Sequence, residues 1–162
     1  PTYAAAWFEL GGVRQTAKDL PGARQAFEQA VQADPKYIKP YLSLAYVHNA
    51  EKNWKGCADA SAAVIRLDPF DFPVAYALNA LSNLRLNNDL AAEASAKKAV
   101  EMGAAPAFPE VEYTLGVIAG SRGDTRTGAE HLTRFLQLAP DHPAAGAVKQ
   151  QLAQWSQPAA PK

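Results

Sequence analysis

The chain has 162 residues, 48% of them apolar, and its 16 basic and 16 acidic side chains give a formal net charge of zero. The apolar content excludes an intrinsically disordered chain, and the balanced charge predicts no basic surface for nucleic acid or an anionic membrane. A single cysteine, Cys57, excludes a disulfide within the chain, and no apolar run is long enough to predict a membrane-spanning helix.

The first predicted unit covers residues 4–37 and consists of two helices. The helix over residues 4–16 is expected to bury one stripe of side chains, formed by Trp7, Leu10, Gly11 and Val13. Asp19 is a predicted N-cap of the second helix, and Pro21 lies in its first turn. Pro35 ends the unit, because proline blocks further helix.

The second predicted unit covers residues 38–71 and repeats the first. Asp68-Pro69 follows Asp34-Pro35 by 34 residues, and a short helix with small and apolar residues precedes each dipeptide. Trp54 is expected to lie between the two helices of this unit, with stacking against a ligand as the alternative. Cys57 occupies a closely packed helix position, which predicts a buried, unreactive thiol.

The third predicted unit, residues 73–106, is the least regular. Asn79 stands where the repeat has leucine, and residues 87–89 are predicted to hold an extra or displaced turn residue. Gly103 is a predicted left-handed cap, and a longer link with two prolines follows it.

The fourth predicted unit covers residues 109–142, with Gly123-Asp124 as its turn. A final helix over residues 144–156 has one apolar stripe, which predicts that it caps the array. The last residues, 157–162, are rich in proline and alanine and are predicted to be a disordered tail.

Four units of about 34 residues, each with two helices, resemble the tetratricopeptide repeat (TPR) family. The first unit matches the family pattern at Trp7, Leu10-Gly11, Ala23, Phe27, Ala30 and Pro35. The second matches at Tyr41, Leu44-Ala45, Cys57, Ser61, Val64 and Pro69. The fourth matches at Leu115-Gly116, Gly123-Asp124, Gly128, Leu132, Phe135 and Pro140.

The resemblance implies an all-α fold, a right-handed α-α superhelix (solenoid) of four helical hairpins and a C-terminal capping helix. These elements are expected to form a single domain over residues 1–156. Gly11, Gly12 and Gly116 lie inside the first helices of their units, where they are expected to allow close contact between helices.

Catalytic chemistry is not predicted. The three histidines, His48, His131 and His142, form no pair spaced for a metal, and no glycine-rich phosphate loop is present. The chain is therefore expected to be neither an enzyme nor a protein with a metal or cofactor.

The resemblance implies instead that the first helices of the units line a groove for a peptide or partner protein. Among the ligand-contacting positions transferred to this chain, those predicted to form the groove are Phe8, Lys39, Leu42, Tyr46, Asn49, Leu81, Arg85, Glu110 and Tyr113. Aromatic and aliphatic anchors beside a few polar groups suit a peptide ligand, although packing between helices is the alternative for each of them. Some TPR proteins hold a peptide C-terminus with a set of basic and amide side chains, and the matching positions here carry Phe8, Gly12, Ser43, Val74 and Leu78. None of the five is suited to bind a carboxylate.

The predicted function is thus a scaffold for protein–protein interaction. Two alternatives stay open: self-association into a homo-oligomer, or a regulatory or anchoring module of a larger protein, an envelope protein included. The chain begins with Pro1 instead of methionine, which favours a processed form or a piece of a longer chain. The composition is typical of bacterial proteins, and both the cytoplasm and the periplasm remain open as compartments.

Overall fold

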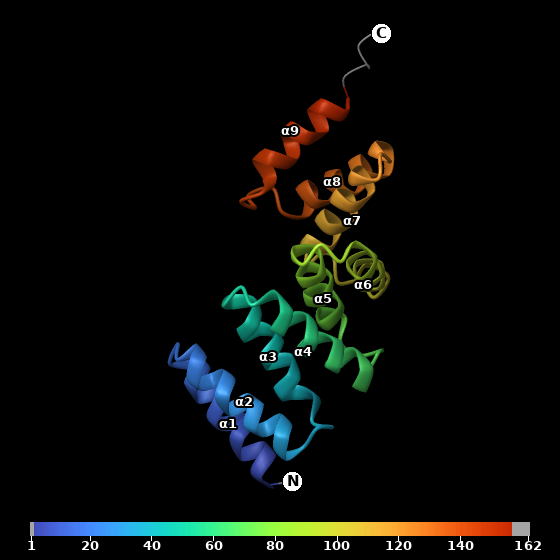
Figure 1. The fold of residues 1–162 in the computed structure, drawn as a ribbon. Coiled ribbons are helices and arrows are strands. Elements are labelled where there is room, and N and C mark those ends of the chain that lie inside the picture. Colours follow the sequence, from blue (N-terminus) through green and yellow to red (C-terminus); the bar gives the residue numbers. More distant parts are fainter. Residues whose placement is uncertain (1, 157–162) are drawn as a thin grey trace.

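The computed structural model describes residues 2–156, which form nine α-helices and no strand. In chain order, the helices are α1 (Thr2–Thr16), α2 (Leu20–Ala33), α3 (Ile38–Ala50), α4 (Trp54–Leu67), α5 (Pro73–Arg85), α6 (Asp89–Glu101), α7 (Glu110–Ser121), α8 (Thr125–Leu138) and α9 (Ala145–Trp155). Consecutive helices pair as four hairpins, α1–α2 to α7–α8, which follow one another in a row with α9 at the end (Figure 1). Each hairpin contacts only its neighbours, as in a solenoid.

The turn inside each hairpin has one recurring construction. A residue with positive φ, which is Lys18, Lys52, Asn87 or Gly123, directly precedes the N-cap residue of the second helix. Asp19, Asn53 and Asp124 then cap their helices by accepting a hydrogen bond from the backbone N–H three residues on. The predicted N-cap at Asp19 is therefore confirmed.

The third hairpin has this same turn, so the predicted displacement at residues 87–89 is wrong. Asn87 has φ +58° and occupies the position of Lys52. The additional residue lies earlier, in the link 68–72, which has five residues where the link 34–37 has four. Length variation thus falls in the links between hairpins and leaves the hairpin turns unchanged.

The repeated Asp-Pro dipeptide closes each of the first two hairpins by hydrogen bonds. Asp34 Oδ1 accepts from the backbone N–H of Lys36 at 3.0 Å, and Asp68 Oδ1 accepts from that of Phe70 at 2.9 Å. The proline carbonyls are also used, because Tyr41 Oη donates to Pro35 O and Tyr76 Oη to Pro69 O. These bonds tie the start of each following helix to the link before it.

Two glycines allow close contact within hairpins. A Cβ atom on Gly11 would lie 2.4 Å from the Phe27 ring, and one on Gly116 would lie 2.7 Å from Leu132. The expectation for Gly12 is wrong, because nothing would lie within 4 Å of a Cβ atom there. Gly12 is on the side of α1 that faces away from α2.

The buried stripe predicted for the first helix is also wrong at three of its four positions. Trp7 and Leu10 are each 37% exposed and Val13 is 67% exposed, whereas Gly11 is buried. The residues of the second hairpin that correspond to Leu10 and Val13 are Leu44 and Val47, and they are only 6% and 1% exposed. The difference arises because α2 covers α3, while among residues 2–156 no helix precedes α1.

The other end of the array is closed by α9. Val148 is 3% exposed and packs in one cluster with Leu132 and Phe135, and Trp155 and Leu152 pack against the same cluster. The capping role expected for this helix is thus visible in its contacts. The predicted tail, residues 157–162, lies outside the described residues, and the assignment of one domain to residues 1–156 stays a prediction.

None of the helices in the described part of the chain is long and apolar enough to cross a membrane.

Candidate binding pocket

A pocket of about 300 Å³ opens where the first helices of three successive hairpins meet. α3 contributes its last turns, α5 its middle, and the third wall is the segment that leads into α7. The lining residues are Tyr46, Asn49, Ala77, Leu78, Leu81, Ala107, Phe108, Pro109 and Glu110.

The pocket's third wall depends on the longest link in the array. The link between α6 and α7 has eight residues, 102–109, where the earlier links have four and five. Gly103, with φ +77°, ends α6 as predicted, and Ala104 and Ala105 are buried directly after it. Phe108 then packs against the core cluster of the third and fourth hairpins and presents its remaining surface to the pocket.

The walls of the pocket are apolar, and its polar groups are few. Tyr46 is 39% exposed, and partial burial raises the pKa of its hydroxyl, which therefore stays protonated and able to donate a hydrogen bond at neutral pH. Asn49 offers both a donor and an acceptor. Glu110 supplies the pocket's carboxylate, and its Oε1 atom lies 3.6 Å from His142 Nε2.

Of the nine residues predicted for the groove, the structure brings together four: Tyr46, Asn49, Leu81 and Glu110. Leu78, which also lines the pocket, was not among the nine, and sequence reasoning missed Ala77, Ala107, Phe108 and Pro109 as well. Ala107, Phe108 and Pro109 belong to the long link with two prolines. The length of this link indicated an irregular connection, but not that it would turn toward α3 and α5.

Two of the other predicted residues pack within the first two hairpins. The Phe8 ring lies 5.8 Å from that of Phe27 and 5.4 Å from that of Tyr37, measured between centroids. Leu42 is half-buried against the same core cluster. Lys39 is exposed on the first turn of α3, outside the pocket.

Tyr113 is separated from the pocket because α9 covers it. Its ring lies 5.4 Å from that of Phe135, and it shares a smaller cavity of about 130 Å³ with Val148 and Gln151 of α9. Tyr113 therefore belongs to the contact between the fourth hairpin and its cap.

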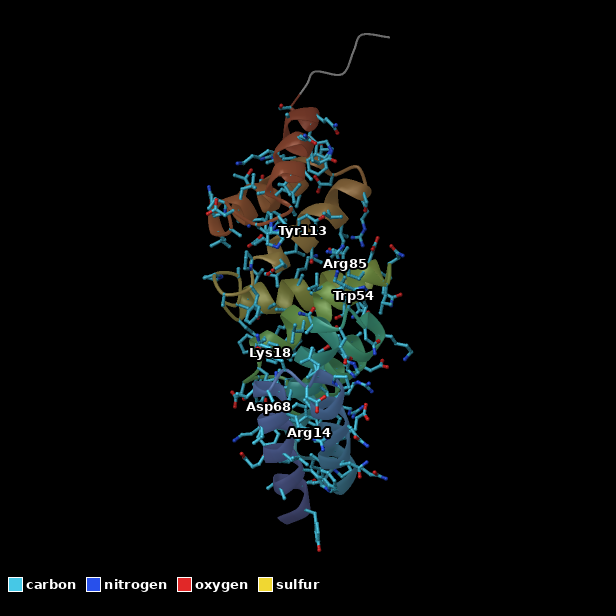
Figure 2. All side chains as sticks on the ribbon, turned by 90° about the vertical axis from the view of Figure 1, so that its left-hand side faces the viewer. Arg14, Lys18, Trp54, Asp68, Arg85 and Tyr113 are labelled. Carbon is cyan, nitrogen blue, oxygen red and sulfur yellow. The ribbon has the colours of Figure 1, made fainter. Side chains whose placement is uncertain are left out.

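Arg85 is the last residue of α5 and is exposed, and its Cζ atom lies 5.8 Å from the centroid of the Trp54 ring. Figure 2 shows these two residues beside each other and Tyr113 farther toward the C-terminal end. Trp54 is half-buried and joins the second hairpin to the third by this cation–π contact, instead of only filling the space inside its own hairpin.

A second, polar cleft lies between α6, α7 and α8. Glu93 accepts hydrogen bonds from Lys97 and Arg122, and these bonds hold the pKa of its carboxyl below the ordinary value. Beside these three residues, the buried Glu112 contacts His131 Nδ1 at 2.6 Å. The charged groups of this cleft are thus paired with one another, and we assign them to contacts between hairpins.

The single cysteine and two of the histidines make contacts within the fold. Cys57 is fully buried, and burial raises the pKa of its thiol, so the thiolate is scarce at neutral pH. His48 Nδ1 lies 3.2 Å from Asn53 Nδ2, and His142 Nδ1 accepts from the backbone N–H of Ala144. Within residues 2–156, no three side chains of the His, Cys, Asp or Glu type are placed to hold a metal ion.

No protein-family model matches the chain, and no curated protein matches it in sequence. Solved structures do match its fold. A MamA protein has a TM-score of 0.78 and 18% identity over 94% of this chain and 86% of that one. PilF of Pseudomonas aeruginosa has a TM-score of 0.70 and 16% identity over 95% and 68%.

A third match, YrrB, is described as a TPR protein with an unusual peptide-binding site. Its TM-score is 0.56 and its identity 14%, over 89% of this chain and 90% of that one. At such identities, these likenesses concern the fold alone. They confirm the all-α superhelix of four hairpins and a capping helix that the repeat pattern predicted.

Proposed function

Because the chain has the tetratricopeptide-repeat fold, we propose that it is a non-catalytic scaffold that binds a peptide segment of a partner protein in the pocket between α3, α5 and α7. The observation that carries this proposal is the convergence of Tyr46, Asn49, Leu81 and Glu110 on one apolar cavity. Pockets of this size bind through apolar contact and gain orientation from a few polar groups.

The pocket's chemistry defines the segment that fits. An aliphatic or aromatic side chain would be buried against Leu81 and Phe108, while Tyr46 and Asn49 would bond the peptide backbone beside it. Glu110 favours a basic residue or a backbone N–H next to that anchor and disfavours a free C-terminal carboxylate. The absence of basic side chains at Ser43, Val74 and Leu78 agrees with this preference.

A displayed library of random peptides, selected against the wild-type chain, tests the proposal. We expect selected peptides to share an apolar anchor next to Lys or Arg, and Leu81→Asp and Tyr46→Ala to weaken their binding by about tenfold or more. Fluorescence polarisation measures the affinities, and circular dichroism confirms that the melting temperatures of the variants are retained. Thr133→Ala on the exposed outer side of α8 is the matched control, with unchanged binding expected.

Equal binding by the wild type and both pocket variants would contradict the proposal. Self-association and a role as a module of a larger protein stay predictions, and the pocket variants test the first of the two. An oligomer held together through the pocket would dissociate on Leu81→Asp without any added peptide.

A further inference from the structure

The outer side of α1 carries an apolar stripe, formed by Tyr3, Trp7, Leu10 and Val13, which we call the open face. These residues recur at intervals of four, three and three, so they lie on one side of the helix. Their exposed fractions are 78%, 37%, 37% and 67%. A helix that exposes large apolar side chains in a row marks an interaction surface.

The chain itself shows what covers this surface elsewhere. Val47, equivalent to Val13, is 1% exposed, and Leu44, equivalent to Leu10, is 6% exposed. Both are buried in the cluster that includes Phe27 of α2, the second helix of the preceding hairpin. The same valine and leucine positions are therefore buried wherever such a helix is present.

The third hairpin repeats this arrangement with different side chains. Asn79, equivalent to Leu10, donates to Ala58 O at 3.1 Å and to Ser61 Oγ at 3.0 Å, and both acceptors belong to α4. The cover is again the second helix of the preceding hairpin, in this case with small residues at the contact. Leu44 and Asn79 differ in chemistry, but each contacts the second helix of the preceding hairpin.

We propose that the open face binds a further helical hairpin, whose second helix packs on α1 in the way that α2 packs on α3. This inference does not depend on the pocket. The partner helix carries small or apolar residues three and four positions apart, as α2 and α4 do. The covered array would then extend by one repeat at its N-terminal end.

A second copy of the chain fits this face less well. The outer side of α9, at the other end of the array, presents the exposed polar residues Lys149, Gln150 and Gln154. Placing it against the open face would bury these polar groups on an apolar stripe, which is unfavourable. Two copies joined through α1 would cover α1 with the first helix of a hairpin, whereas α3 and α5 are both covered by the second helix of the preceding hairpin.

An extended chain tests the proposal, because the sequence offers a matched junction. Pro1-Thr2-Tyr3 corresponds to Pro35-Lys36-Tyr37, so a copy of residues 2–35 can replace Pro1 and keep the length of the natural link. We expect the extended chain to unfold at a higher urea concentration than the original. The position of the added helix is then tested by Val13→Asp.

In the original chain, Val13→Asp should change the unfolding equilibrium constant by less than about threefold, because the side chain is exposed. In the extended chain, the same change should alter it by about tenfold or more, as Val47→Asp should in both chains. An extended chain with an unchanged midpoint, or with no effect of Val13→Asp, would overturn the proposal. So would a concentration-dependent dimer of the original chain that Val13→Asp disperses in analytical ultracentrifugation, because the occupant would then be a second copy.

Discussion

The second and third hairpins place opposite chemistry at the same positions. Leu44 and Asn79 both lie eight residues before the positive-φ residue of their turns. Leu44 shares an apolar cluster with Phe27 of the preceding hairpin, whereas Asn79 bonds Ser61, which is the equivalent of Phe27. The second hairpin thus has an apolar contact, Leu44 with Phe27, where the third has a hydrogen-bonded polar contact, Asn79 with Ser61.

The polar pair is stable because its hydrogen bonds are complete. Asn79 Oδ1 accepts from Asn83 Nδ2 at 2.9 Å and from Ser95 Oγ at 2.8 Å, while Ser61 Oγ donates to Cys57 O at 2.7 Å. A buried polar network is tolerated when every member has a partner and is costly when one is missing. The turns and helix spacing thus set the shape of a repeat, while its core chemistry can differ between repeats when the contacting residues differ together.

The largest effect is expected when the polar residue is placed alone in the apolar hairpin. Leu44→Asn should lower the free energy of unfolding by about 3–5 kcal/mol, because it removes apolar volume and buries an amide without partners. Urea denaturation followed by circular dichroism measures the loss. Leu10→Asn, the same change at the exposed equivalent position, should cost less than about 1 kcal/mol, and equal losses for the two variants would contradict the assigned environments.

A smaller loss is expected from the reverse exchange. Asn79→Leu introduces the residue that the second hairpin uses, yet it should destabilise the chain by about 1–3 kcal/mol, because Asn83, Ser95 and Ser61 lose their common partner. The double variant with Ser61→Ala should recover part of this loss in the same denaturation experiment, since one of the abandoned polar groups is then removed. A single variant more stable than the wild type would show that the network contributes nothing to stability.

The smallest effect is expected at the N-caps of α4 and α6, which are the second helices of the second and third hairpins. Asn53 accepts from the backbone N–H of Gly56 at 3.0 Å, but Asn88 makes no such bond and donates instead to Asn83 Oδ1 at 3.3 Å. Asn53→Ala should therefore cost about 1 kcal/mol, and Asn88→Ala only about half as much. Thermal unfolding of both variants checks the ranking, and a larger loss for Asn88→Ala would reverse it.

Local chemistry could be read from the sequence because it depends on neighbours within a few residues. Asp19 caps α2, Pro21 lies in its first turn and Gly103 ends α6, all as predicted. The interval between Asp34-Pro35 and Asp68-Pro69 was sufficient to identify the repeat and its all-helical fold.

Features that depend on distant neighbours could not be read in this way. Leu10 and Val13 match the repeat pattern as well as Leu44 and Val47 do, but only the second pair has a helix before it in space. Tyr113 fits the pattern of a groove residue, and α9 covers it. Whether a side chain in the first or last hairpin is buried thus depends on helices outside its own hairpin.

The pocket has residues of both kinds, so only part of it could be predicted from the sequence. Tyr46, Asn49 and Leu81 follow from the repeat positions, because α3 and α5 keep the regular packing of the array. Phe108 and Pro109 belong to the long link, whose path is determined by packing against the third and fourth hairpins. No periodic pattern describes such a segment.

Hydrogen–deuterium exchange with a selected peptide tests the central proposal most directly, because it reports on every part of the described chain at once. Binding in the pocket predicts slower exchange in the last turns of α3, in the middle of α5 and in residues 102–110, with α1 and α8 unchanged. Protection confined to α1 or α8, with these three segments unaffected, would contradict the proposal that the pocket is the binding site.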